Sequence, residues 1–250
     1  MLNFKSYLKN KLKFNWQLGL FLILAFGIPR FIVVLIASKT GDYRLTSFIF
    51  IAMWFLPFLL LNKLGRKQIG ITKPKKPSWL FFGFILGGLV CTLVWFLGNL
   101  LYGETINNWL VYISNSYQVP IDENFENVRF TYFLIFGITS MIFSPIGEEL
   151  LYRGLIHRSF SESMGENKAS IIDSTAFAIT HLAHFGLLFV AGNWEFRLLP
   201  ALLWMLLMFI TSRIFFYVKQ KSGSILGAIL SHAGFNLAMT YFIFYHIFKI

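Results

Sequence analysis

Residues 130–151 read FTYFLIFGITSMIFSPIGEELL, an apolar stretch that runs into two consecutive glutamates, Glu148 and Glu149. An α-helix needs about 20 mostly apolar residues to cross the hydrocarbon core of a bilayer, and this stretch is long enough. A charge within such a helix costs about 2.5–3.5 kcal/mol on insertion, so it is a candidate functional group by default. This segment therefore predicts a membrane-spanning helix that carries part of a functional site.

The composition extends the membrane prediction to the whole chain. Hydrophobic residues make up 56% of the 250 residues and charged residues 13%, whereas a soluble domain carries about 25% charged residues. Most of the surface must therefore face lipid, and the bilayer is the first expected partner. Apolar stretches predict spans at 16–37, 46–64, 79–101, 130–151, 169–190, 198–218 and 225–247. The predicted fold is all-α, a polytopic membrane protein with about seven transmembrane helices in a single domain, 1–250.

The net charge of +11 is divided among the segments between these spans. A nucleic-acid-binding protein gathers its charge on one folded face, so nucleic acid is not an expected partner. The excess of Lys and Arg in cytoplasmic loops predicts the orientation instead. With seven spans, one side holds most of the basic residues, and the other holds the acidic residues Asp122, Glu123 and Glu126. We expect a multi-pass protein of the cell membrane, with its N-terminus inside, its C-terminus outside and its site facing the cytoplasm.

Helical spacing separates the two glutamates of the quoted stretch. Positions four apart share a helix face, so Glu149 can pair with Arg153. Glu148 lies about 100° further round the helix and cannot use the same partner. This leaves Glu148 available as a general base. A salt-bridge cluster at the membrane interface is the alternative.

Two further polar clusters lie in apolar stretches. His181 precedes His184 by three residues, so the two could ligate a metal together, although a lone histidine in a helix is more often a core residue. His232 and Asn236 share a face and could form an interhelical hydrogen-bonding pair. Counted from the predicted inner helix ends at about 1.5 Å per residue, Glu148, His181 and His232 all lie about 15 Å deep. This shared level favours one site within the helix bundle.

The three clusters, taken in order, resemble the motifs EExxxR, FxxxH and HxxxN of the CPBP intramembrane proteases. This family includes the CAAX-processing Ras-converting enzyme and bacteriocin-processing or immunity proteins. The motifs here read Glu148-Glu149…Arg153, Phe177…His181 and His232…Asn236. The resemblance covers about residues 130–240, which we expect to form the catalytic core. The first three spans match the family only in being hydrophobic.

The resemblance implies a catalytic set and a supporting set of residues. The catalytic set is Glu148 as the base that activates water, His181 as a holder of that water, and His232 with Asn236 as stabilisers of the oxyanion. The supporting set is the pair Glu149 and Arg153, with Phe177 shaping the wall. The family pattern gives His184 no role.

The sequence leaves the cofactor open. The family is metalloprotease-like, and zinc catalysis usually needs three protein ligands, which Glu148, His181 and His232 could supply. The chain lacks an HExxH motif, and a glutamate-dependent site without metal uses the same residues. We expect no obligatory cofactor, with zinc as the alternative.

The predicted function is that of an intramembrane endopeptidase that cleaves membrane-associated peptides or proteins by water activated at Glu148. The resemblance implies CAAX-type substrates, some of them prenylated, or leader peptides. The alternatives are a non-catalytic membrane scaffold or immunity protein and a proton-coupled transporter, in which buried Glu and His residues relay protons. Oligomeric state stays open, because the GxxxG pair Gly83 and Gly87 serves dimerisation in some proteins and internal packing in others.

Overall fold

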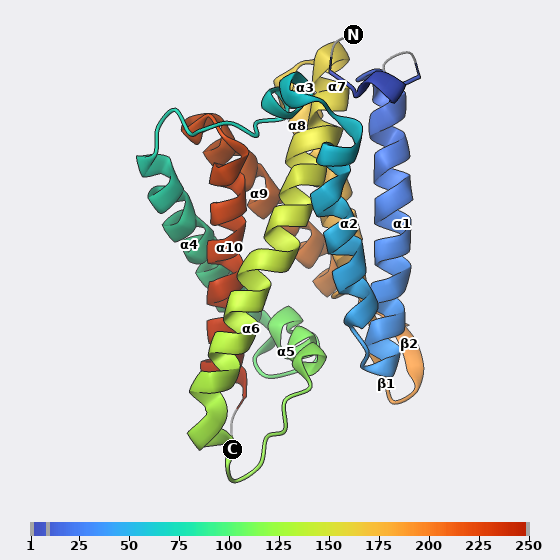
Figure 1. Cartoon of the computed structure of the whole chain (residues 1–250). Helices are drawn as coiled ribbons and strands as arrows, with labels where there is room; N and C mark the ends of the chain where they lie inside the picture. The colour runs from blue at the N-terminus through green and yellow to red at the C-terminus, as the bar shows by residue number, and fades with distance from the viewer. Residues whose placement is uncertain (1–2, 9–10, 249–250) are drawn as a thin grey trace.

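The computed structural model describes residues 3–8 and 11–248; residues 1–2, 9–10 and 249–250 of the predicted domain lie outside the described part. The chain is mostly helical (78%) and forms a bundle (Figure 1). Within the described residues, five helical segments are long and apolar enough to cross a membrane: Trp16–Thr40, Ser78–Tyr102, Phe125–Met164, Leu198–Ser222 and Ile225–Ile247. The prediction of a mainly α-helical membrane protein is confirmed at this level. The total of seven spans stays a prediction, since the helices in the second and fifth predicted spans are shorter.

Asparagine side chains cap the starts of two helices in the first third of the chain. The side chain of Asn15 accepts a hydrogen bond from the Leu18 N–H at the start of α1 (Trp16–Thr40), as expected for an N-cap asparagine. Helix α1 ends at Gly41, whose φ of 77° lies in the left-handed region that glycine adopts without strain. The shorter apolar helix α2 (Arg44–Leu60) follows, and Asn62 then caps the short α3 (Lys63–Gln68).

The quoted stretch lies within a continuous helical run that contains a π-helix. The run consists of α6 (Phe125–Glu148), the π-helix η3 (Glu149–Ile156) and α7 (His157–Met164). A π-helix is rare and is found most often at functional sites. Every residue of η3 is buried, and the segment begins directly after Glu148.

The fifth predicted span, 169–190, differs from the structure. Helix α8 (Glu166–Thr180) ends early, a short 3₁₀ turn η4 (His181–Ala183) follows, and the chain then forms an antiparallel hairpin of β1 (Leu187–Val190) and β2 (Asn193–Phe196). The two turn residues, Ala191 and Gly192, have φ of 48° and 85°, the backbone that a two-residue hairpin turn requires. The helix predicted over 169–190 was wrong after Thr180, because periodicity does not distinguish a short apolar strand from a buried helix.

Helix α4 (Ser78–Tyr102) packs closely against α10 (Ile225–Phe242), which continues as the π-helix η5 (Ile243–Ile247). A Cβ atom at Gly87 would lie 1.8 Å from the Ser231 carbonyl oxygen, and one at Gly234 would lie 2.0 Å from the Phe84 carbonyl oxygen. The two backbones therefore touch, with no room for a side chain between them. The glycines of the GxxxG pair are used inside the molecule, since a Cβ at Gly83 would lie 2.5 Å from Val218.

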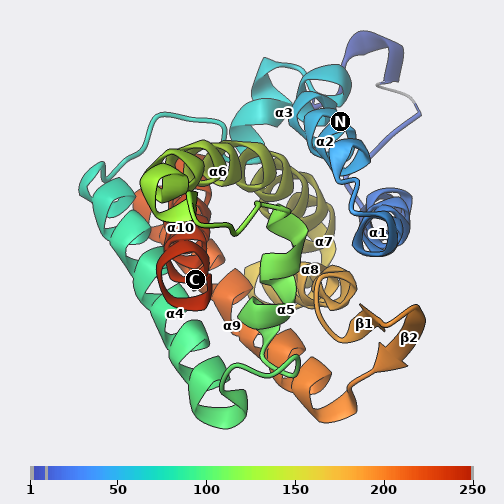
Figure 2. The ribbon, with the colours of Figure 1, turned by 90° about the horizontal axis from the view of Figure 1, so that it is seen from below.

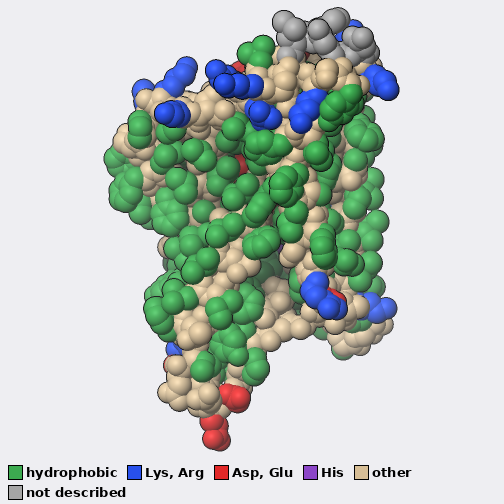
Figure 3. Space-filling model, viewed as in Figure 1, with side chains coloured by type: hydrophobic (Ala, Val, Ile, Leu, Met, Phe, Trp, Pro, Cys, Tyr) green, Lys and Arg blue, Asp and Glu red, His purple; other side chains and the backbone are tan. Residues whose placement is uncertain are grey.

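The two ends of the bundle differ in charge. Lys and Arg side chains gather at the end that carries the N-terminus, α3 and α7, and acidic side chains project from the opposite end (Figure 3). We call these the basic end and the acidic end. The C-terminus lies at the acidic end, where the short α5 (Trp109–Ser114) and η2 (Asn115–Tyr117) fold back inside the ring of long helices (Figure 2). Helix α9 (Leu198–Ser222) completes the ring. The charge asymmetry agrees with the prediction; which end faces the cytoplasm stays a prediction.

Candidate active site

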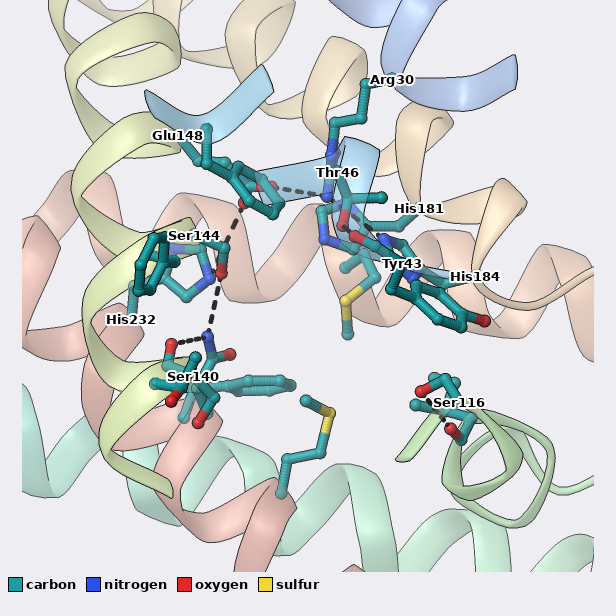
Figure 4. Close-up of a pocket in the computed structure, with 18 of the residues that line it drawn as sticks. Arg30, Tyr43, Thr46, Ser116, Ser140, Ser144, Glu148, His181, His184 and His232 are labelled. Atoms are coloured by element: carbon teal, nitrogen blue, oxygen red, sulfur yellow. Dashed lines mark hydrogen bonds and ion pairs between the residues drawn. The ribbon is translucent and has the colours of Figure 1, made fainter. Parts of the chain in front are cut away.

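The three motifs converge in the middle of the bundle (Figure 4). Glu148 is the last residue of α6, and its Oε2 lies 3.8 Å from Nε2 of His232 in α10. The Phe177 ring of α8 lies 4.2 Å from the His181 ring and 5.9 Å from the His232 ring, measured between centroids. The structure therefore brings these predicted residues together in one cluster, as the shared depth suggested.

The predicted pair of Glu149 and Arg153 is present and fully buried. Arg153 Nη1 donates to Glu149 Oε1 over 3.1 Å, and both side chains are 0% exposed. Arg153 Nη2 also donates to the Ser212 hydroxyl of α9, and the guanidinium lies 4.3 Å from the centroid of the Phe177 ring. Arg153 thus joins the π-helix to α8 and α9.

Glu149 also fixes the orientation of His232. Its Oε1 lies 2.9 Å from His232 Nδ1. An ionised carboxylate only accepts hydrogen bonds, so Nδ1 carries the proton. The opposite nitrogen, Nε2, then faces Glu148. The ring stacks on Phe215, with centroids 4.8 Å apart and planes 18° apart, so the imidazole is held on its face as well.

His181 is held in one tautomer by the backbone. Its Nδ1 lies 2.7 Å from the Phe177 carbonyl oxygen, which can only accept, so Nδ1 is the donor. The lone pair is therefore on Nε2. The His181 carbonyl accepts a hydrogen bond of 3.0 Å from Trp204 Nε1 of α9, which fixes η4 against that helix.

Glu148 is not unpaired, contrary to the expectation from spacing. Arg30 of α1 places Nη2 2.5 Å from Glu148 Oε1, and Nη1 donates to Thr180 Oγ1 over 2.7 Å. The same Nη2 lies 3.4 Å from His184 Nε2, and Arg30 is 2% exposed. Helical spacing only detects partners within one helix, whereas this partner comes from another. The sequence did carry a signal, since Arg30 is the only charged residue within 16–37.

Asn236 lies one turn along α10 from His232 and faces α6. Its Nδ2 donates to the Ser140 carbonyl over 2.8 Å and to the Ser144 hydroxyl over 3.1 Å. Both amide hydrogens are therefore used, in the orientation assigned to the side chain. To donate to a substrate oxygen, Asn236 must exchange its bond to Ser144.

A cavity of about 280 Å³, here named the site cavity, connects these side chains. Glu148, His181, His232 and Asn236 line it at one end, and Tyr43 and Ser116 line it toward the acidic end. Among the described residues, none of α3 or α7 at the basic end lines the cavity. The cavity thus extends away from the basic end. That the site faces the cytoplasm stays a prediction.

The residues do not fit a zinc site in this arrangement. Among the described residues, no three His, Cys, Asp or Glu side chains are gathered so that they could hold a metal ion. Zinc would need ligand carboxylates free to bind it at about 2.0–2.2 Å, whereas Glu148 is already paired with the positive charge of Arg30, whose Nη2 lies 2.5 Å from Oε1. His184 also faces Arg30 rather than a site shared with His181.

Comparison with known proteins gives one match. Residues 130–238 match the family model "Type II CAAX prenyl endopeptidase Rce1-like". The matched range begins in α6 and ends in α10, so it includes every motif residue and leaves out Arg30. No curated protein and no solved structure matches the chain. The resemblance is thereby confirmed over this range: residues 130–238 match an Rce1-like family model, which supports the CPBP and CAAX protease family.

Proposed function

We propose that this protein is an intramembrane endopeptidase and that Glu148 is the base that activates water in its site cavity. The observation that carries the proposal is the position of the Glu148 carboxylate. It is fully buried and lines the cavity, and no donor among the described residues forms a hydrogen bond to its Oε2. A buried carboxylate oxygen with accepting capacity to spare is suited to hold a water molecule.

The proposed reaction uses one water per peptide bond. Glu148 takes a proton from the water while the water oxygen bonds to the carbonyl carbon, which gives a tetrahedral oxyanion. The carbon–nitrogen bond then breaks, and the proton passes from Glu148 to the leaving nitrogen. The products are a carboxyl group and an amine. His181 contributes the lone pair on Nε2, which accepts a hydrogen bond from the attacking water and orients it.

Two arginines balance the two glutamates of the site. Arg30 pairs with Glu148 and Arg153 pairs with Glu149. Two carboxylates so close together in a poorly hydrated interior would repel each other strongly without these partners. The pairs therefore allow one carboxylate to act on water while the other keeps His232 in place.

The oxyanion would be stabilised from α10. Asn236 donates from Nδ2 once the substrate carbonyl replaces the Ser144 hydroxyl as its acceptor. His232, whose ring Glu149 orients through Nδ1, would donate from Nε2 when that nitrogen carries a proton. Both donors come from one rigid helix, so their spacing is fixed before the substrate binds.

The walls of the cavity support an apolar, membrane-associated substrate. The exposed wall surface is mostly apolar, and aromatic side chains contribute to it, among them Phe50, Phe143, Phe215 and Phe235. The matched family model names CAAX prenyl endopeptidases, and a peptide with a prenyl group or an apolar flank would suit these walls. We therefore favour CAAX-type substrates over leader peptides.

The test compares cells that produce the wild-type protein, Glu148→Gln or the matched control Glu123→Gln. Glu123 is exposed outside the site, so its variant carries the same chemical change without touching the cavity. Mass spectrometry of membrane-associated proteins and their new termini should show the same cleavage products for wild type and control and none for Glu148→Gln. Protein amounts are compared by immunoblot.

Equal cleavage profiles in all three strains, at equal protein levels, would contradict the proposal. If the protein is instead a non-catalytic scaffold or immunity protein, the Glu148→Gln strain should keep the cellular phenotype of the wild-type strain. A proton-coupled transporter would lose uptake in that strain without any change in the peptide profile.

A further inference from the structure

A second, smaller cavity of about 70 Å³ lies beside the site cavity, toward the acidic end. Polar side chains supply much of its wall: Ser38 of α1, Tyr43, Tyr112 of α5, and Asn115 and Ser116 of η2. Tyr43, Ser116 and His184 line both cavities, so the two cavities adjoin (Figure 4). We name the smaller one the polar cavity.

The polar cavity has the size and lining that water requires. A buried water needs about 10–15 Å³ of probe-occupied volume and two to four polar partners. The cavity exceeds that volume several times, and its hydroxyl and amide groups supply the partners. Asn115 is exposed and Ser116 is half-buried, so the wall reaches the surface of the acidic end. The exposed wall surface of the site cavity, by contrast, is mostly apolar.

His184 stands between the polar cavity and the groups that would hold the attacking water. Its Nε2 lies 3.4 Å from Arg30 Nη2, and the same nitrogen of Arg30 lies 2.5 Å from Glu148 Oε1. The His184 ring is 5.6 Å from the His181 ring, measured between centroids. A water that leaves the polar cavity past His184 therefore arrives beside both Glu148 and His181.

We propose that the polar cavity is the water entrance of the site and that His184 is the positioning residue through which water passes to Glu148. This inference rests on the proposed function, because peptide hydrolysis consumes one water per bond and the mostly apolar wall surface of the site cavity favours an apolar substrate over water. Water then enters the site cavity beside Tyr43, Ser116 and His184, the residues that the two cavities share. The role of His184, which lies outside the family motifs, follows from this arrangement.

The first test measures water access without any assay of activity. Cys91 is the only cysteine of the chain and is buried, so Cys91→Ala gives a cysteine-free background. In purified full-length protein in detergent-free nanodiscs, Ser38→Cys and Ser116→Cys should react with a small charged methanethiosulfonate reagent. Thr92→Cys, on the exposed face of α4, should stay unlabelled because it faces lipid. Absence of labelling at both polar-cavity positions would overturn the proposal.

The second test measures turnover. His184→Phe should lower kcat at least tenfold with a smaller change in KM, because it blocks the passage of water from the polar cavity, whereas His184 is only one of many residues that line the site cavity. His184→Gln, which keeps a polar group there, should recover most of the loss. Ser116→Leu narrows the same entrance at a half-buried position and should also lower kcat, which keeps the test valid if His184→Phe does not fold.

The outcomes separate this inference from the proposed function. If Glu148→Gln cleaves like wild type, the proposed function fails, whatever the labelling shows. If Glu148→Gln is inactive but Ser38→Cys and Ser116→Cys stay unlabelled, only the water entrance fails. The role of His184 would likewise be overturned if His184→Phe raised KM by the same factor by which it lowered kcat, and if His184→Gln did not recover either value.

Discussion

Helices α4 and α10 pack backbone to backbone, whereas α2 and α6 meet at one level and then diverge (Figure 1). In the first pair, Gly87 and Gly234 each lie against a carbonyl oxygen of the opposite helix. In the second pair, the contact is made at Gly147, where a Cβ would lie 2.8 Å from the Phe50 carbonyl oxygen. Below that level both helices line the site cavity. One side of the bundle is thus closed, and the other opens around the site.

The difference between the two helix pairs indicates how the site can be rigid on one side and accessible on the other. His232 and Asn236 lie on α10, the helix held by backbone contact with α4. Glu148 directly follows Gly147, so it lies where α2 and α6 meet. The closed side therefore fixes the positions of His232 and Asn236, and the open side, where α2 and α6 diverge below their contact, is where we expect the substrate to enter.

The largest expected effect distinguishes the two glutamates. Glu149→Gln removes the charge partner of Arg153, which is 0% exposed, and should cost about 3–5 kcal/mol of stability. Glu148→Gln should cost less, because Arg30 keeps its bond to Thr180 and faces the cavity. Thermal unfolding in detergent measures both. Equal losses of stability in the two variants would mean that facing the cavity does not lower the cost of leaving a buried arginine without its carboxylate.

The second effect concerns turnover rather than stability. Asn236→Ala removes one oxyanion donor and should lower kcat by about a hundred- to a thousandfold, equivalent to about 2.7–4 kcal/mol. Leu237→Ala is the control: Leu237 lies on the same turn of α10 and packs near Gly137 rather than on the cavity. A peptide-cleavage assay in nanodiscs compares them. If both variants lose activity equally, Asn236 acts through packing and not as a donor.

The third effect tests the closed side directly. Gly87→Ala should lower the free energy of unfolding by about 1–3 kcal/mol, because its Cβ would lie 1.8 Å from the Ser231 carbonyl oxygen and force the helices apart. Gly88→Ala is the matched control on the same helix, since its nearest contact would be an ordinary 3.7 Å. Alanine should be neutral or stabilising there. Similar melting temperatures for both would show that α4 and α10 pack less closely than described.

The smallest effect lies at the basic end. The hydrogen bond from His157 Nε2, 2.9 Å long, lowers the pKa of Glu166 from its usual 4.5 to about 2. This bond therefore stabilises the fold fully above pH 4.5 and is lost as the pH falls toward 2. Glu166→Gln should cost at most about 1 kcal/mol at pH 7, since the side chain is half exposed. The difference in melting temperature should vanish between pH 4.5 and 2; a constant difference would contradict the assignment.

The sequence predicted those features that depend on local spacing. Hydropathy located the long helices, and the interval of four residues gave the pair of Glu149 and Arg153. Equal depth along separate helices correctly predicted that Glu148 and His232 lie close together. These features follow from helix geometry, which a sequence specifies directly.

The features that the sequence did not predict depend on contacts between segments far apart in the chain or on the backbone dihedral angles of single residues. Arg30 reaches Glu148 across the bundle, and no interval in the sequence encodes that contact. The hairpin at Ala191 and Gly192 required two residues with positive φ, only one of which is glycine. The direction of the site cavity depends on how far α2 and α6 diverge, which is a property of tertiary packing.

The π-helix η3 has a consequence for the kinds of genetic change this segment can absorb. A π-turn holds one residue more than an α-turn, so deletion of Leu151 would let the backbone relax into an ordinary α-helix with its hydrogen bonds intact. The helix beyond the π-turn would then keep nearly its present orientation, because the extra residue is absorbed within that turn. His157 would stay beside Asp173, to which its Nδ1 is bonded at 2.7 Å. Loss of one codon would instead act inside η3, where it would shorten the interval between Glu149 and Arg153 from four residues to three.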